Sequence, residues 1–104
     1  MKNEGAVLSV KFKSTHNPEQ LHKISKDDLE IFRNVPGLLQ KYYISEEVTG
    51  AFSGFYIFDS KSARSAFWTS ELAKRIPARY GVLPETLRVE EYELVIVLDE
   101  TEFA

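Results

Sequence analysis

Few side chains of this sequence are suited to acid–base chemistry. The chain has two histidines, His16 in a predicted loop and His22 at the edge of a predicted helix, and a histidine general base would have to be one of them. The five tyrosines are the other candidates, and Tyr56 lies in the middle of a strongly apolar stretch. A hydroxyl placed there needs a hydrogen-bond partner or a ligand, although a core tyrosine is the simpler interpretation.

The single tryptophan, Trp68, is a third candidate for contact with a ligand. At 100° per residue it falls on the charged side of its predicted helix, together with Arg64 and Glu71. A tryptophan on such a face needs a cover. If loops or a stacked Arg64 side chain cover it, Trp68 has a structural role. If it forms the wall of a pocket or a subunit contact, Trp68 has a functional role.

Charged side chains give weaker indications. Glu91 and Glu93 project from the same face of a predicted strand and could divide acid and base roles, but a solvated strand explains them equally well. The arginines near the end of the chain could neutralise an anionic substrate or pair with acidic neighbours. The sequence has no glycine-rich phosphate loop, nucleophile elbow or metal-ligand spacing. Spacing alone therefore identifies no catalytic residue and no metal site.

Length and composition restrict the class of protein. With 104 residues, 43% of them hydrophobic, the chain has the size of a single domain, residues 1–104. A net charge of −3 argues against nucleic acid as a partner. The absence of cysteine excludes disulfides, thiolate nucleophiles and the usual zinc sites. No apolar run resembles a signal peptide or approaches a membrane span, so we expect a soluble cytoplasmic protein without a membrane partner.

The elements that position these residues follow from periodicity. Residues 6–12 alternate as a half-buried strand, with Leu8, Val10 and Phe12 on one face. Asn17 and Pro18 begin an amphipathic helix that ends at Pro36-Gly37.

Asp28 is the anomaly of this first helix, because it projects into the middle of the apolar arc. Either a charge is buried there, or Ser25 caps a fresh helix start with Asp28 in the capping-box position. The second interpretation removes the buried charge and is the one we favour.

Three further elements complete the chain. Residues 38–45 and 51–59 form two strands of an antiparallel hairpin around a turn at residues 48–50. Ser60 caps a second helix that runs to Ile76, where Pro77 stops it, and residues 86–98 form the last strand.

This strand–helix–strand–strand–helix–strand order predicts an α+β, ferredoxin-like fold: a four-stranded antiparallel sheet with both helices on one face. The stretch 52–59 and the end of the last strand, residues 94–98, are apolar at nearly every position, which indicates cover on both faces of the sheet. A second copy of the chain would provide that cover and close a dimeric α/β barrel.

Two segments resemble a known family. V-P-G-L-L-Q-K-Y-Y-I-S-E-E at residues 35–47 and G-F-Y-I-F-D-S-K-S-A at residues 54–63 are similar to the YdhR-like mono-oxygenase family of the dimeric α/β-barrel superfamily. The resemblance extends over roughly residues 7–98.

The resemblance implies a homodimer that oxygenates a small aromatic or polycyclic compound in an apolar pocket, with no cofactor, neither metal nor flavin. Haem-degrading relatives pair their tryptophan with a histidine and an asparagine, and the second helix here has no histidine, so a haem site is disfavoured. A non-enzymatic dimer that binds or senses a small molecule is the alternative. In both cases we expect Trp68, Tyr56 and His22 to contact the ligand.

Overall fold

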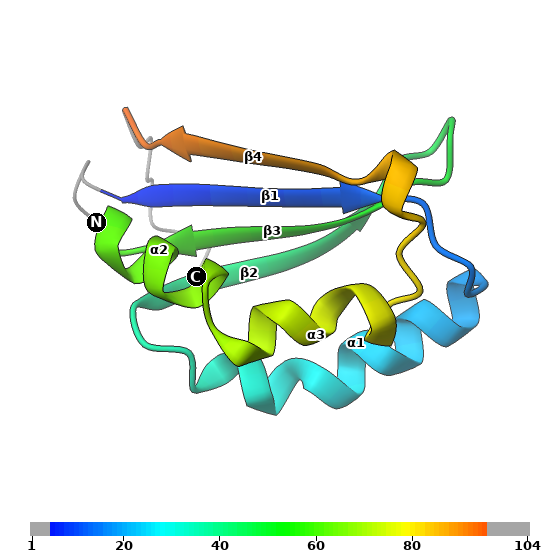
Figure 1. Ribbon diagram of the computed structural model, residues 1–104, viewed down its shortest axis with the longest axis horizontal. Helices are drawn as coiled ribbons and strands as arrows, with labels where there is room; N and C mark the ends of the chain where they lie inside the picture. Colours follow the sequence, from blue (N-terminus) through cyan, green and yellow to red (C-terminus); the bar gives the residue numbers. More distant parts are fainter. Residues whose placement is uncertain (1–4, 96–104) are drawn as a thin grey trace, which may run out of the picture.

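Four strands form one antiparallel sheet in the order β2-β3-β1-β4, and the helices lie along one face of it (Figure 1). The computed structural model describes residues 5–95. The strands are β1 Ala6–Phe12, β2 Leu38–Ser45, β3 Phe52–Phe58 and β4 Arg88–Glu93. The helices are α1 Pro18–Arg33, α2 Lys61–Trp68 and α3 Glu71–Arg79, followed by a short 3-10 turn at Pro84–Thr86. The chain therefore has the ferredoxin-like α+β fold that its element order predicts.

The centre of the sheet holds the core. β1 pairs with both β3 and β4, and the predicted alternation is confirmed, because Leu8, Val10 and Phe12 are buried on the side that faces the helices. Tyr56 and Phe58 of β3 complete this buried surface.

The hairpin of β2 and β3 brings a lysine onto the same buried face. Lys41 lies opposite Tyr56 in the register, and Tyr43 lies opposite Gly54. Because side chains alternate along a strand, Lys41 and Tyr43 share the face that α1 and α3 cover.

The first helix differs from the prediction at Ser25. α1 is continuous from Pro18 to Arg33 and is capped by Asn17, whose side chain accepts a hydrogen bond from the Gln20 amide. Ser25 begins no new helix, and Asp28 is a buried residue within the continuous α1. The prediction fails because Arg79 of α3 supplies the counter-charge that a buried carboxylate needs.

The second predicted helix is two helices. α2 begins after the Ser60 cap as predicted and ends at Trp68, and Ser70 then caps α3 by accepting from the Ala73 amide. Pro77 does not stop α3 but lies within it, where its missing N–H removes one helical bond shortly before the helix ends.

The other face of the sheet is open in the single chain. Tyr42 on β2 is 48% exposed, and Phe55 and Ile57 of β3 are partly exposed beside it. The predicted two-sided apolarity of β3 is thus present. β4 is shorter than the predicted strand 86–98 and carries Arg88, Glu90 and Tyr92 on this face. Residues 96–98 lie outside the described range. No helix within residues 5–95 is both long and apolar enough to span a membrane.

Candidate functional site

The most unusual group under the helices is the amine of Lys41. Its Nζ lies 3.2 Å from the ring centroid of Phe32, 4.1 Å from that of Tyr43 and 4.5 Å from that of Tyr56. It also donates a 2.9 Å hydrogen bond to the Tyr43 hydroxyl. Three aromatic rings and one hydroxyl therefore surround a single amine.

A chain of hydrogen bonds leads from Lys41 toward the surface. The hydroxyls of Tyr43 and Tyr80 are 3.2 Å apart, and Tyr80 donates to Asp28 Oδ2 at 2.8 Å. Since Tyr80 gives its one proton to Asp28, Tyr43 is the donor in the bond between the two tyrosines. Arg79 closes the chain with its Nε and Nη2 on the Asp28 carboxylate, the shortest contact being 2.8 Å. We call Lys41, Tyr43, Tyr80, Asp28 and Arg79 the polar chain.

Burial and charge set the protonation of the two ends of the polar chain. Burial lowers the pKa of Lys41 to about 6, and the negative charge of Asp28 acts against that shift. The surrounding ring faces also favour the ammonium form. Burial by itself would raise the pKa of Asp28, but hydrogen bonds from Arg79 and Tyr80 and the nearby positive charges outweigh it and leave that pKa below its ordinary value. Asp28 is thus ionised at neutral pH, and Lys41 can change its charge there.

The tyrosines of this region stay neutral. Burial raises the pKa of Tyr43 to about 12, and the hydrogen bond that joins it to Tyr80 opposes this shift. Burial likewise raises the pKa of Tyr56 and that of Tyr80. Their hydroxyls therefore act as hydrogen-bonding groups that relay protons, and Lys41 is the group that titrates.

Of the cavities that adjoin the polar chain, two share an aromatic wall. A small one of about 10 Å³, room for one molecule the size of water, lies between Lys41, Tyr43, Tyr56 and Tyr80. The second, of about 320 Å³, lies between the first half of α1 and the β2–β3 hairpin, and we call it the hairpin pocket. Its lining residues are Pro18, Leu21, His22, Ser25, Tyr43, Ile44, Ser45, Gly50 and Phe52. Tyr43 and Phe52 line both cavities and stack at 5.9 Å between ring centroids, so an aromatic wall joins them.

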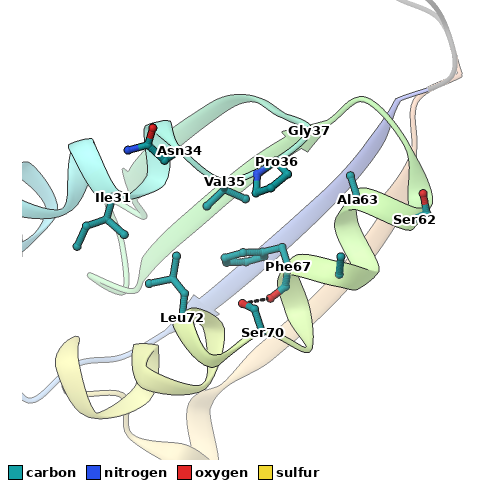
Figure 2. Close-up of a pocket in the computed structure, with 11 residues that line it drawn as sticks. Ile31, Asn34, Val35, Pro36, Gly37, Ser62, Ala63, Phe67, Ser70 and Leu72 are labelled. Carbon is teal, nitrogen blue, oxygen red and sulfur yellow. Dashed lines mark hydrogen bonds between the residues drawn. The ribbon is translucent and has the colours of Figure 1, made fainter.

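A larger cavity has no comparable chemistry. This groove has a volume of about 710 Å³. It lies between the end of α1 with Pro36 and Gly37 on one side and α2 with the start of α3 on the other (Figure 2). We call it the helix groove. None of its lining residues is titratable, and the Ser70 hydroxyl is engaged by the Phe67 carbonyl oxygen, to which it donates, and by the Ala73 amide. The helix groove could hold an apolar molecule but offers no acid or base.

The three residues predicted from the sequence are not brought together. Tyr56 is 2% exposed and lines the small cavity beside Lys41, whereas His22 is exposed and lines the hairpin pocket next to it. Trp68 is half-buried at the end of α2, packs against the core and lines none of the cavities described above. Their contact with a ligand stays a prediction.

Arg64 is not on a charged outer face beside Trp68. It is buried and donates to the carbonyl oxygens of Val7 and Tyr92, so it ties α2 to β1 and β4. The interpretation of Arg64 as a stacking cover for Trp68 was wrong, because its guanidinium is turned to the sheet and bonded to these two carbonyl oxygens.

Sequence reasoning missed Lys41 and the role of Asp28. A signal for Lys41 was present, since the alternation of β2 places it on the same face as Tyr43 and the hairpin register places it opposite Tyr56. The pairing of Asp28 with Arg79 joins residues 51 positions apart and left no local signal. Among residues 5–95 no group of three or more acidic or histidine side chains could hold a metal ion.

Comparisons with known proteins bear on the fold. No protein-family model matches the chain, and no curated protein does either. Solved structures do match. NE2512, a protein of unknown function from Nitrosomonas europaea, has 18% identity over 92% of this chain and 94% of its own, with a TM-score of 0.71.

Two similar structures are oxygenases. The monooxygenase of the gene ActVA-Orf6 of Streptomyces coelicolor, solved with nanaomycin D, has 19% identity over 92% of both chains and a TM-score of 0.65. SnoaB, a cofactor-independent oxygenase from Streptomyces nogalater, has 10% identity over 95% of this chain and 99% of its own, with a TM-score of 0.64. At these identities the likeness establishes a shared fold, over nearly the whole chain, with antibiotic-biosynthesis-type monooxygenases.

Proposed function

We propose that this chain is a homodimeric mono-oxygenase, of the kind that the YdhR-like resemblance implies, which oxidises a small electron-rich phenol without metal or flavin. The observation that carries the proposal is the amine of the half-buried Lys41, which three aromatic rings surround and which is hydrogen-bonded to Tyr43 at the wall of an aromatic pocket. The oxygenases that share the fold support the reaction class.

The phenol binds in the hairpin pocket with its hydroxyl against Tyr43. The volume of the hairpin pocket, about 320 Å³, lies at the lower end of the range for small-molecule sites. With Lys41 neutral, the Tyr43 hydroxyl turns its proton from Tyr80 to the amine, 2.9 Å away, gives it to Lys41 and takes the phenol proton in exchange. The resulting ammonium lies one hydroxyl group away from the phenolate, and its positive charge stabilises the anion.

The phenolate then reduces dioxygen that enters the hairpin pocket beside the ring. A C–O bond forms at a carbon ortho to the phenolate oxygen, on the side of the ring near Tyr43, and the proton held by Lys41 returns through the Tyr43 hydroxyl to the peroxide. The O–O bond breaks, and hydroxide leaves with the ortho proton as water. Phenol and O₂ give a quinone and water, so the ring supplies all four electrons and no external reductant is needed.

Oxygen consumption tests the proposal. Wild-type protein in the presence of a chelator should consume O₂ with at least one member of a panel of phenols, naphthols and quinols. Lys41→Met should reduce the rate by about 10²-fold or more, the range for loss of an acid–base group. Lys13→Met, at an exposed lysine after β1, is the matched control. Folding of each variant is checked by circular dichroism.

The alternative function is a non-enzymatic dimer that binds or senses a small molecule. The helix groove, apolar and without acid or base, favours it. Phenols that raise the melting temperature of the wild type without any O₂ consumption would replace the oxygenase with this binding function.

A further inference from the structure

The hydroxyl of Ser25 is a polar group without a partner in the wall of the hairpin pocket. Ser25 is 6% exposed, and its Oγ makes no hydrogen bond within residues 5–95. Buried side-chain hydroxyls in folded proteins nearly always have a partner, because an unpaired one loses its hydration without compensation. Such a group in a cavity wall indicates that something absent from the protein itself bonds to it.

The protein around Ser25 offers no substitute. A serine within a helix often donates to the carbonyl oxygen one turn back, but this hydroxyl does not. Asp28, one turn further along α1, has its carboxylate occupied by Arg79 and Tyr80. The Ser25 Oγ is enclosed in this structure, but Ser25 lines the hairpin pocket, so a rotation about its Cα–Cβ bond brings the unpaired hydroxyl to a ligand there.

The opposite wall of the hairpin pocket indicates the shape of the ligand. Tyr43 and Phe52 form a stacked aromatic surface there. A planar ring lies well against such a surface. Ser25 on α1 and Tyr43 on β2 then approach the ring from two different elements. A ring that satisfies both hydroxyls needs two polar substituents.

We propose that Ser25 determines substrate specificity, by hydrogen-bonding a second oxygen substituent of an aromatic ligand whose first hydroxyl meets Tyr43. The inference rests on the proposed function for the placement of that first hydroxyl. The preferred ligands are dihydroxylated or hydroxy-keto aromatics. Monophenols leave Ser25 unpaired and bind more weakly.

Binding measured without turnover tests this inference. Phenol, catechol, resorcinol and hydroquinone are titrated under anaerobic conditions into the wild type, Ser25→Ala and Ser65→Ala by isothermal titration calorimetry. Ser65 is exposed on α2, away from the pocket, and serves as the matched control. The wild type should bind at least one dihydroxybenzene about tenfold more tightly than phenol, as one additional hydrogen bond provides.

Ser25→Ala should remove most of that tenfold preference and leave the affinity for phenol unchanged, while Ser65→Ala preserves both. The melting temperature of Ser25→Ala without ligand should equal or exceed that of the wild type, because an unpaired hydroxyl has been removed. A preference that survives in Ser25→Ala, or an equal loss for phenol and the dihydroxybenzenes, overturns the inference.

The outcomes separate the two proposals. If the dihydroxybenzene preference depends on Ser25 but no O₂ is consumed with any phenol, the specificity assignment stands and the oxygenase does not. If O₂ is consumed with phenol and with dihydroxybenzenes at rates that Ser25→Ala leaves unchanged, the oxygenase stands and Ser25 has no part in selection. Wild-type protein that binds none of the four compounds contradicts the inference directly.

Discussion

At the scale of single residues, the unusual feature is a lysine where the pattern of the sheet calls for an apolar side chain. Lys41 extends from β2 under α1, and the faces of three aromatic rings surround its amine. Burial and the ring faces act on its charge in opposite directions, since burial favours the amine and the rings favour the ammonium. A group balanced in this way can take up and release a proton near neutral pH, as the proposed reaction requires.

Stability as a function of pH checks the state of Lys41. Its pKa is lowered from 10.5 to about 6 in the folded chain, so between these values the unfolded state binds more protons and stability rises with pH. The free energy of unfolding of the wild type, minus that of Lys41→Met, should therefore increase with pH above pH 6. The increase should be up to about 1.4 kcal/mol per pH unit.

Urea denaturation at several pH values between 6 and 9 measures this difference. Lys13→Met is again the control, because that lysine is exposed. If the stabilities of wild type and Lys41→Met change with pH in parallel, Lys41 keeps its charge throughout. That result would contradict the proton transfer proposed for Lys41.

Ser25 and Asp28 show how far local signals reach. A serine followed three residues later by an acid is the pattern of a capping box, and it misled the prediction at Ser25. Asn17 and Ser60 are true caps and were predicted as such, whereas Ser70, also a true cap, was not. Ser60 and Ser70 are both followed three residues later by alanine, so the capping-box pattern marks neither of these true caps. Whether a serine near an acid begins a helix depends on the distant partner of that acid, which here is Arg79.

At the scale of elements, the Asp28–Arg79 pair joins α1 to α3. The carboxylate is 5% exposed and accepts from both Arg79 and Tyr80, so the two helices share one buried charge. These helices cover the face of the sheet that holds Lys41. The pair therefore fixes the helices that enclose the polar chain.

Substitution at Asp28 should reveal this connection. Asp28→Asn keeps the size of the side chain but removes the charge, and we expect a loss of about 1–3 kcal/mol of stability in urea denaturation. Asp27→Asn, at the exposed neighbour that pairs with Lys23 on the helix surface, should change stability by less than about 0.5 kcal/mol.

Two further measurements belong to this prediction. Because the pKa of Asp28 is lowered, its contribution is complete above its ordinary value of 3.8 and disappears as the pH falls through the lowered pKa. Asp28→Asn combined with Arg79→Gln should cost less than the sum of the two single substitutions. Additive costs, or equal effects at Asp27 and Asp28, would mean that the pair does not hold the helices together.

At the scale of the whole molecule, the fold could be predicted and the site could not. The order of strands and helices follows from periods of two and 3.6 along the chain, which are local properties, and this order determines which face the helices cover. The polar chain joins residues of α1, β2 and α3 and the residue that follows α3. Local sequence patterns therefore predict the order of the elements, but they do not predict contacts between residues that lie far apart in the sequence.

The open face of the sheet leads to the last prediction, which concerns assembly. Phe55 lies in the middle of that face, opposite Tyr42 on β2 and Ser9 on β1, and stays partly exposed in the single chain. Exposed aromatic side chains on a four-stranded face are typical of a surface that a partner covers. We expect the wild type to sediment at twice the mass of one chain at micromolar concentration and to unfold and dissociate together.

A charge on this face should prevent the assembly. Phe55→Lys places an ammonium where two copies would meet and should yield monomer or unfolded protein. Val48→Lys, in the hairpin loop where Val48 is 89% exposed, should remain dimeric. If the wild type sediments as a folded monomer upon dilution, it does not form the proposed dimeric barrel. The polar chain would be unaffected, because its residues lie on the opposite face of the sheet and come from one chain.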